Sequence, residues 1–127
     1  MDNNYNNYEP IYLQIIRRIC YQIFRGEYKP GDKLPSWIDA GLAFDVNHNT
    51  IARVYQELAL LGIIETRRGE GSFVTDNQSR IDELHDNMRD DLISTMVMEM
   101  TQMGYSLDDI NQAFSRYIDS VSEVSHY

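Results

Sequence analysis

The sequence has one cysteine, three prolines and no long apolar run, and these shortages exclude several classes of protein. A single cysteine, Cys20, cannot form a disulfide within the chain, which favours a reducing, cytoplasmic location. No stretch approaches the roughly 20 apolar residues that cross a bilayer, and residues 1–10 lack the basic-then-apolar order of a secretory signal. Because Cys20 falls among Ile16, Ile19 and Ile23 at helical spacing, we expect it to be buried rather than redox-active.

The sequence also lacks the side-chain groupings that catalysis or metal binding requires. No Ser-His-Asp, Cys-His or paired-carboxylate arrangement stands out, and the Gly-Glu-Gly at 69–71 is not followed by the Lys-Ser/Thr of a phosphate-binding loop. His85 with Asp82 and Asp86 has a metal-like composition, but these residues offer too few ligands at helical spacing. We therefore predict that the protein is not an enzyme and uses no metal or other cofactor.

The net charge of −9 is spread unevenly along the chain. Residues 1–75 contain 8 Lys and Arg against 9 Asp and Glu, whereas residues 76–127 contain 3 against 11. A segment as acidic as the second would be repelled by phosphate, whereas the first part can contact phosphate if its arginines cluster on one face. We predict two domains that meet at this change of charge, residues 1–75 and residues 76–127.

The first part of the chain has the pattern of three short helices followed by a β-hairpin. Apolar residues recur at helical spacing in three stretches, and Ser36 and Asn47 stand where helix caps are expected. Gly26 and Gly62 are suitable helix ends. Before the first helix, residues 1–8 are rich in Asn and Tyr and are expected to form a mobile arm. The predicted elements are helices over 10–26, 36–45 and 47–62, strands over 63–66 and 72–75, and a turn at 67–71.

The third predicted helix opens with Asn-His-Asn-Thr, and the N-terminus of a recognition helix is where side chains reach base edges in the major groove. The hairpin that follows, with Arg67 and Arg68 at its tip, has the shape of a wing. The alternatives are a polar helix start kept for stability and ordinary charges at a hairpin tip. Together these features predict a mainly α protein with a small β-hairpin wing, whose N-terminal winged helix-turn-helix domain binds DNA.

Residues 76–127 show a second helical pattern, which is interrupted at Gly104 and restarted by Ser106 with Asp109 as a capping box. Two helices alone cannot bury their apolar faces, and a two-fold partner would cover them. We therefore expect a C-terminal two-helix dimerisation segment. A small hydrophobic effector bound in the methionine-rich seam at 96–103 is the alternative. The residues assigned to the dimer seam are Leu84, Met88, Leu92, Met96, Ile110, Phe114, Tyr117 and Ile118.

Four motifs in this order resemble the GntR family of bacterial transcription regulators: PIYLQI at 10–15, GEYKPGDKLPS at 26–36, VNHNTIARVYQEL at 46–58 and GIIETRRGEGSFV at 62–74. The resemblance covers essentially all of residues 10–75, and the short two-helix tail is similar to that of the YtrA subfamily. It implies a homodimeric repressor that acts on a palindromic double-stranded DNA operator, often near genes for a membrane transporter.

The resemblance also implies roles for matching residues. The start of the third helix would face bases or phosphates, and Arg53 would reach a phosphate or help to orient the helix. The wing would lie against the minor groove, with glycines that permit its tight turn. The residues implied to bind DNA are Ser36, Asn47, His48, Asn49, Thr50, Arg53, Arg67, Arg68 and Gly69.

The second predicted helix departs from the family pattern PSVRELAxxLGV, because this chain reads PSWIDAGLAFDV. Ile38 stands where an arginine that meets DNA is expected, and Asp45 stands where glycine usually makes the turn. Gly41 replaces a helix-favouring alanine. Trp37 is expected in the core or at its edge, and a contact with the DNA backbone is the alternative. These departures predict an unusual operator or a lower affinity. They leave open a winged-helix protein-interaction module with weakened DNA binding.

Overall fold

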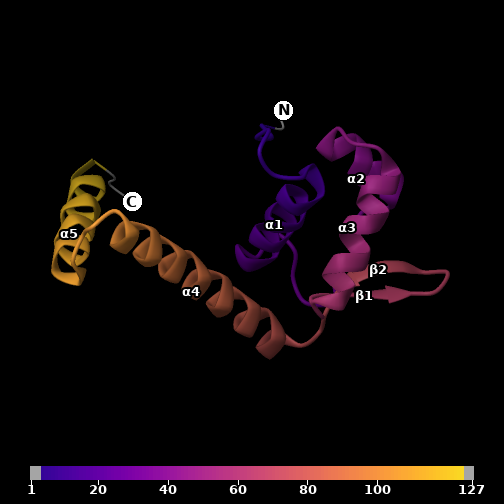
Figure 1. Cartoon of the computed structure of the whole chain (residues 1–127). Coiled ribbons are helices and arrows are strands. Elements are labelled where there is room, and N and C mark those ends of the chain that lie inside the picture. Colours follow the sequence, from indigo (N-terminus) through magenta and orange to yellow (C-terminus); the bar gives the residue numbers. More distant parts are fainter. Residues whose placement is uncertain (1–3, 125–127) are drawn as a thin grey trace. The chain divides into compact units, whose positions relative to one another are not determined.

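The computed structural model describes residues 4–124, and within them the chain forms five helices and one two-stranded antiparallel sheet (Figure 1). This is the predicted mainly helical architecture with a small hairpin. None of the helices in the described range is long and apolar enough to span a membrane. The elements are α1 (Ile11–Phe24), α2 (Trp37–Phe44), α3 (His48–Leu60), β1 (Ile64–Arg67), β2 (Gly71–Val74), α4 (Gln78–Gln102) and α5 (Leu107–Val124).

The chain divides into two compact units, one up to His85 and one from Asp86 onward. The division predicted at residue 75 follows the change of charge, whereas the first compact unit extends into α4. Ile81 and Leu84 of α4 are buried. The Arg80 side chain donates hydrogen bonds of 2.6 and 2.9 Å to the Leu61 carbonyl just after α3. The beginning of α4 therefore helps to hold the end of α3.

The core of the first unit is built around the inward face of α3. Ile51, Val54 and Leu58 lie at helical spacing along this face, and each side chain is fully buried. Burying an aliphatic side chain of this size contributes about 1.5–3 kcal/mol, so this stripe fixes the rotation of α3 about its axis. The stripe packs with buried apolar residues from the other elements of the unit, among them Ile15, Ile19, Cys20, Ile23, Leu34, Ile63, Ile64 and Val74.

Cys20 lies inside this core on α1, with 1% of its surface exposed. Burial raises the pKa of its thiol to about 11, because the charged thiolate loses its hydration. The thiol is therefore protonated near neutral pH and unreactive. The prediction that Cys20 serves packing is confirmed.

The hairpin pairs Ile64 with Val74 at its base and Arg67 with Gly71 at its end. The turn is therefore shorter than predicted and consists of residues 68–70. Arg67 was expected at the tip but belongs to β1, where its guanidinium lies 4.0 Å from the centre of the Phe73 ring. This cation–π contact and the pairing with Gly71 extend the strand by one residue.

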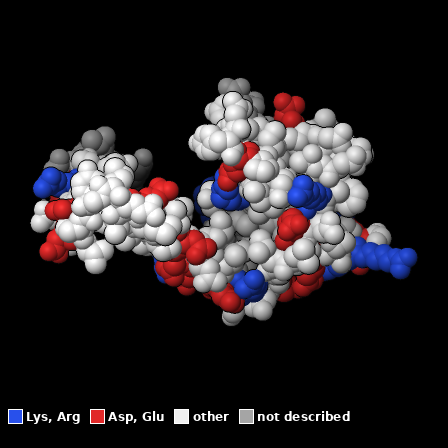
Figure 2. Space-filling model, in the orientation of Figure 1, with Lys and Arg blue, Asp and Glu red and all other residues white. Residues whose placement is uncertain are grey.

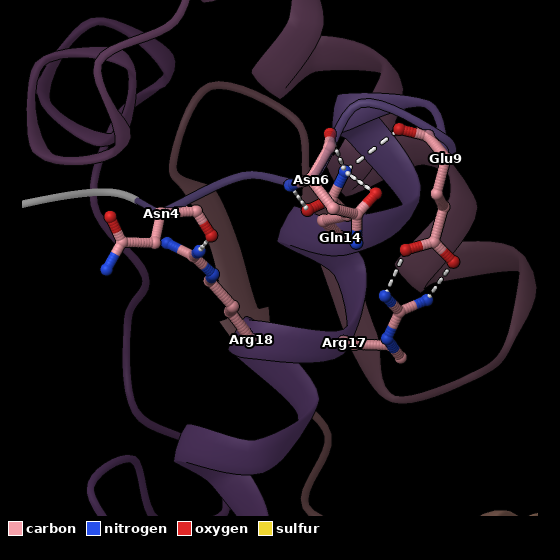
Figure 3. A network of polar contacts seen from close by, with 6 residues as sticks. All are labelled: Asn4, Asn6, Glu9, Gln14, Arg17 and Arg18. Atoms are coloured by element: carbon pink, nitrogen blue, oxygen red, sulfur yellow. Dashed lines mark hydrogen bonds and ion pairs between the residues drawn. The ribbon is translucent and has the colours of Figure 1, made fainter.

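The N-terminal arm is held against α1, so the expectation of a mobile arm is wrong for residues 4–8 (Figure 3). The buried Gln14 amide accepts a 3.0 Å hydrogen bond from the Asn6 backbone N–H. It donates to the Asn6 carbonyl at 3.2 Å and to the Glu9 carbonyl at 2.9 Å. Arg17 pairs with the Glu9 carboxylate. Residues 1–3 of the predicted arm lie outside the described residues.

The same arm also reaches the end of α2. The Tyr5 hydroxyl donates a 2.6 Å hydrogen bond to the Phe44 carbonyl, in the last turn of that helix. The Arg18 guanidinium stacks 4.5 Å from the centre of the Tyr5 ring and donates to the Asn4 carbonyl. The arm thus links α1 to the turn between α2 and α3.

Two unusual residues shape the turn from α2 into α3. Asp45 follows α2 in the left-handed conformation, with φ of 57°, so aspartate performs here the turn that glycine usually makes. Gly41 is buried, and a Cβ atom at this position would lie 2.9 Å from the Val46 carbonyl oxygen and 3.5 Å from the His48 Cα. Glycine therefore lets the backbone of α2 approach the start of α3 closely.

This close approach reverses the effect expected from helix propensity for Gly41→Ala. Propensity alone predicts a gain of about 1 kcal/mol, whereas the clash with the Val46 carbonyl predicts a net loss of about 1–3 kcal/mol. Urea unfolding followed by circular dichroism measures the difference. Ala43→Gly, at an exposed position of the same helix, is the control and should lose about 1 kcal/mol. A Gly41→Ala variant more stable than the native protein would contradict this packing.

Candidate nucleic-acid interface

The start of α3 presents polar side chains to solvent, whereas Ile51, Val54 and Leu58 further along the helix are buried. Asn47 caps the helix, since its side chain accepts a 2.7 Å hydrogen bond from the Asn49 backbone N–H. Asn47, His48 and Asn49 are exposed, and Thr50 is half-buried. The predicted cap is confirmed, and the cap leaves the His48 ring and the Asn49 amide accessible to a partner.

An open hollow of about 680 Å³ lies between the start of α2, the start of α3 and the second strand of the wing. The loop before α2 contributes Lys33 to its lining, and α3 contributes His48. Ser36 lies at its edge as the cap of α2, and its hydroxyl accepts a 3.1 Å hydrogen bond from the Asp39 N–H. The lining also includes the acidic residues Asp39 and Glu70, so side chains of both charges lie beside the start of α3 on one face of the first unit.

A second open hollow, of about 390 Å³, lies between α3 and the hairpin. Arg67, Arg68 and Gly69 line it from the wing, and Ala52 and Gln56 line it from α3. Figure 2 shows basic atoms projecting at the end of the hairpin, where the turn that contains Arg68 and Gly69 lies. Five of the nine predicted DNA-binding residues therefore line the two hollows, namely Ser36, His48, Arg67, Arg68 and Gly69, whereas Asn47, Asn49, Thr50 and Arg53 line neither.

Arg53 lines neither of these hollows. Its guanidinium lies 3.6 Å from the centre of the Tyr12 ring on α1, which is a close cation–π contact. Of the two roles that the resemblance implies, this position fits the one that orients α3, because the contact ties α3 to α1.

Arg67 is also engaged within the protein. Besides its stacking on Phe73, its guanidinium lies 3.7 Å from the Glu65 carboxylate and 4.0 Å from that of Asp76. Arg68, by contrast, is exposed in the turn beside Gly69, whose φ of 77° is the left-handed conformation that glycine adopts without strain. Arg68 is therefore the more accessible of the two predicted wing arginines.

Three residues on this face are absent from the predicted DNA-binding set. Gln56 is exposed on α3, two turns after His48, and continuing the helical spacing of the polar start would have found it. Lys33 lines the first hollow because its backbone pairs with Phe73 of β2, a contact with no local signal in the sequence. Trp37, expected in the core or at its edge, is 50% exposed and lines both hollows.

The second unit carries most of the predicted dimer seam. The capping box at the start of α5 is confirmed, since Ser106 and Asp109 exchange hydrogen bonds of 3.1 and 3.3 Å. Leu92, Tyr117 and Ile118 are 67%, 65% and 54% exposed within the single chain. Met88, Met96 and Phe114 are half-buried.

Two residues assigned to the seam are already buried within one chain. Leu84 belongs to the first compact unit with 9% of its surface exposed, because the first turns of α4 pack there. Ile110 is 3% exposed in the second unit. Neither residue offers the open apolar surface that a partner would cover.

His85, which stands in a metal-like composition, stacks its ring on Phe24, with ring centres 4.4 Å apart. Within residues 4–124, no group of three or more potential ligands is placed to hold a metal ion.

Comparison with known proteins finds relatives that are transcription regulators, and some of them match most of the chain. The family described as bacterial regulatory proteins, gntR family, matches residues 11–74. The uncharacterized HTH-type transcriptional regulator YhcF of Bacillus subtilis is 38% identical over 94% of this chain and 98% of its own length. The HTH-type transcriptional repressor YtrA of the same organism is 33% identical over 81% of this chain and 80% of its own length.

Solved structures share the fold. A GntR family transcriptional regulator from Listeria monocytogenes has a TM-score of 0.83 and 33% identity, over 88% of this chain and 98% of that one. The DNA-binding domain of AraR in complex with operator ORX1 has a TM-score of 0.54 and 25% identity, over 57% of this chain and 93% of that one. The chain therefore belongs to the GntR family of bacterial regulatory proteins and is a winged-helix, DNA-binding transcription regulator.

Proposed function

We propose that this regulator is a dimeric repressor that binds a palindromic operator through the face made by the two hollows. The observation that carries the proposal is the division of α3 into a fully buried apolar stripe and an exposed polar start that borders both α2 and the wing. The relative YtrA is named a repressor, and the AraR domain is in complex with an operator. A regulator of this kind acts on chromosomal DNA, which in a bacterium lies in the cytoplasm.

The proposed docking places the start of α3 in the major groove. His48 and Asn49 would reach base edges there, since an asparagine amide can pair with adenine and a histidine ring nitrogen can donate or accept a hydrogen bond. Arg68 would follow the neighbouring backbone or minor groove from the tip of the wing. Arg53 would keep α3 in register against α1 through the Tyr12 ring.

The proposed dimer uses the exposed apolar residues of the second unit. Leu92, Tyr117 and Ile118 are more than half exposed in one chain, and a two-fold partner would remove this apolar surface from water. In Figure 2 much of the visible surface of this unit carries neither acidic nor basic atoms. A dimer built here would set two half-sites about one turn of DNA apart.

Alanine substitutions test the DNA face. We expect His48→Ala and Asn49→Ala each to weaken binding to the native upstream DNA by about 1–3 kcal/mol, because each removes a base contact. Fluorescence anisotropy measures the affinity, and Gln112→Ala, on the side of α5 opposite the proposed seam, is the control. Native-like affinity in both variants, or equal affinity of the native protein for scrambled DNA, would contradict the proposed face.

Arg68→Ala should lower affinity for specific and scrambled DNA alike, because a phosphate contact carries no sequence information. The slope of log affinity against log salt should become shallower by about 1. Arg116→Ala, an exposed arginine of α5, should leave the slope unchanged. The wing contact would be refuted by a slope that stays the same in Arg68→Ala.

A charge placed on the apolar face of α5 tests the dimer. Tyr117→Glu and Ile118→Glu should give a monomer in analytical ultracentrifugation, since a dimer would have to bury the new carboxylate. Helix content should be kept, because both side chains are exposed in the single chain. Gln112→Glu, on the opposite side of the same helix, should remain dimeric. If the two seam variants and the control have the same mass, the seam lies elsewhere.

A further inference from the structure

Helix α2 exposes three large apolar side chains to solvent, and contact with water alone does not explain their presence there. Trp37 is 50% exposed, Ile38 65% and Leu42 77%. Ile38 and Trp37 line the first hollow together with His48 at the start of α3. Leu42, one turn further along α2, lines neither hollow. The apolar surface of α2 thus has one part on the DNA face and one part outside the hollows.

The chemistry of Ile38 limits what it can contact on DNA. Its side chain has no hydrogen-bond donor and no charge, so it cannot bind phosphate or the polar edges of bases. The apolar group that the major groove presents is the C5 methyl of thymine. Ile38 shares its hollow with His48, one of the residues placed at base edges by the proposed docking. An aliphatic side chain at this position can therefore cover a thymine methyl of the same half-site.

We propose that Ile38 is a specificity-determining residue that reads a thymine methyl group in each operator half-site. This inference rests on the proposed docking of α3 in the major groove. Because the side chain is largely exposed in the free protein, the contact removes apolar surface from water on both partners. Ile38 thus makes a contribution that depends on base identity and is insensitive to salt, unlike a basic side chain at the same position.

The test uses an operator obtained by selection from random DNA and bound by the whole 127-residue chain. Each thymine in turn is replaced by deoxyuridine, which removes the methyl group and leaves the pairing edge intact. We expect one position in each half-site where this replacement weakens native binding about three- to tenfold, the effect of losing one buried methyl contact.

Substitution of Ile38 then tests whether this side chain contacts that methyl group. Ile38→Ala should weaken binding to the thymine operator by a similar factor. The affinity of this variant should not change when deoxyuridine replaces thymine at that position, because the two changes remove the same contact. Leu42 is also apolar and exposed on the same helix, so Leu42→Ala is the control. This variant should keep the native affinity for the operator and the native loss of affinity when deoxyuridine replaces thymine. Circular dichroism verifies that both variants are folded.

Ile38→Arg gives an independent readout. It should raise affinity for all DNA sequences, steepen the salt dependence by about one unit of slope, and abolish the sensitivity to deoxyuridine. The inference is overturned if no thymine is sensitive, or if Ile38→Ala remains as sensitive as the native protein. If the native protein selects no sequence, the docking proposal is overturned as well. If it binds a specific sequence but Ile38 and the thymine methyl are not coupled, only the role of Ile38 is overturned.

Discussion

Complete burial of one stripe of α3 is the constraint on which the rest of the proposed DNA face depends. Ile51, Val54 and Leu58 leave the helix no freedom to rotate without exposing aliphatic surface, so the polar start must face solvent. The hairpin joins the same core through Ile64 and Val74, which pair with each other at its base. The head of α3 and the wing are therefore positioned by one set of apolar contacts, and the hollows between them follow from that packing.

The position of α2 depends on backbone contacts. Gly41 allows α2 to lie close to the start of α3, and Asp45 makes the left-handed turn that joins them. Tyr5 binds the carbonyl of Phe44 at the end of α2, while the rest of the arm is fastened to α1 through Gln14. The departures of α2 from the family pattern are thus accommodated without loss of the helix-turn-helix. One of them, Ile38, is exposed and lines the first hollow, where we propose that it makes an apolar contact with DNA.

The sequence predicted correctly the features that depend on residues close together in the chain, such as the helix caps. The caps at Ser36, Asn47 and Ser106 each use an atom within three residues, and the structure contains all three. The features that the sequence did not reveal depend on contacts between separate secondary-structure elements. Arg67 lies in β1 and not in the turn, because it stacks on Phe73 of the opposite strand. Leu84 is buried in the first unit, although its helical spacing matched the apolar stripe predicted for the C-terminal segment.

Trp37 offers the most direct measurement of the central claim that DNA covers the face formed by α2, α3 and the wing. It is the single tryptophan of the chain, is half exposed and lines both hollows. Acrylamide should quench its fluorescence readily in the free protein and much less at saturating operator, with complex formation verified by anisotropy in the same sample. An unchanged quenching constant in the fully formed complex would show that DNA binds to another surface.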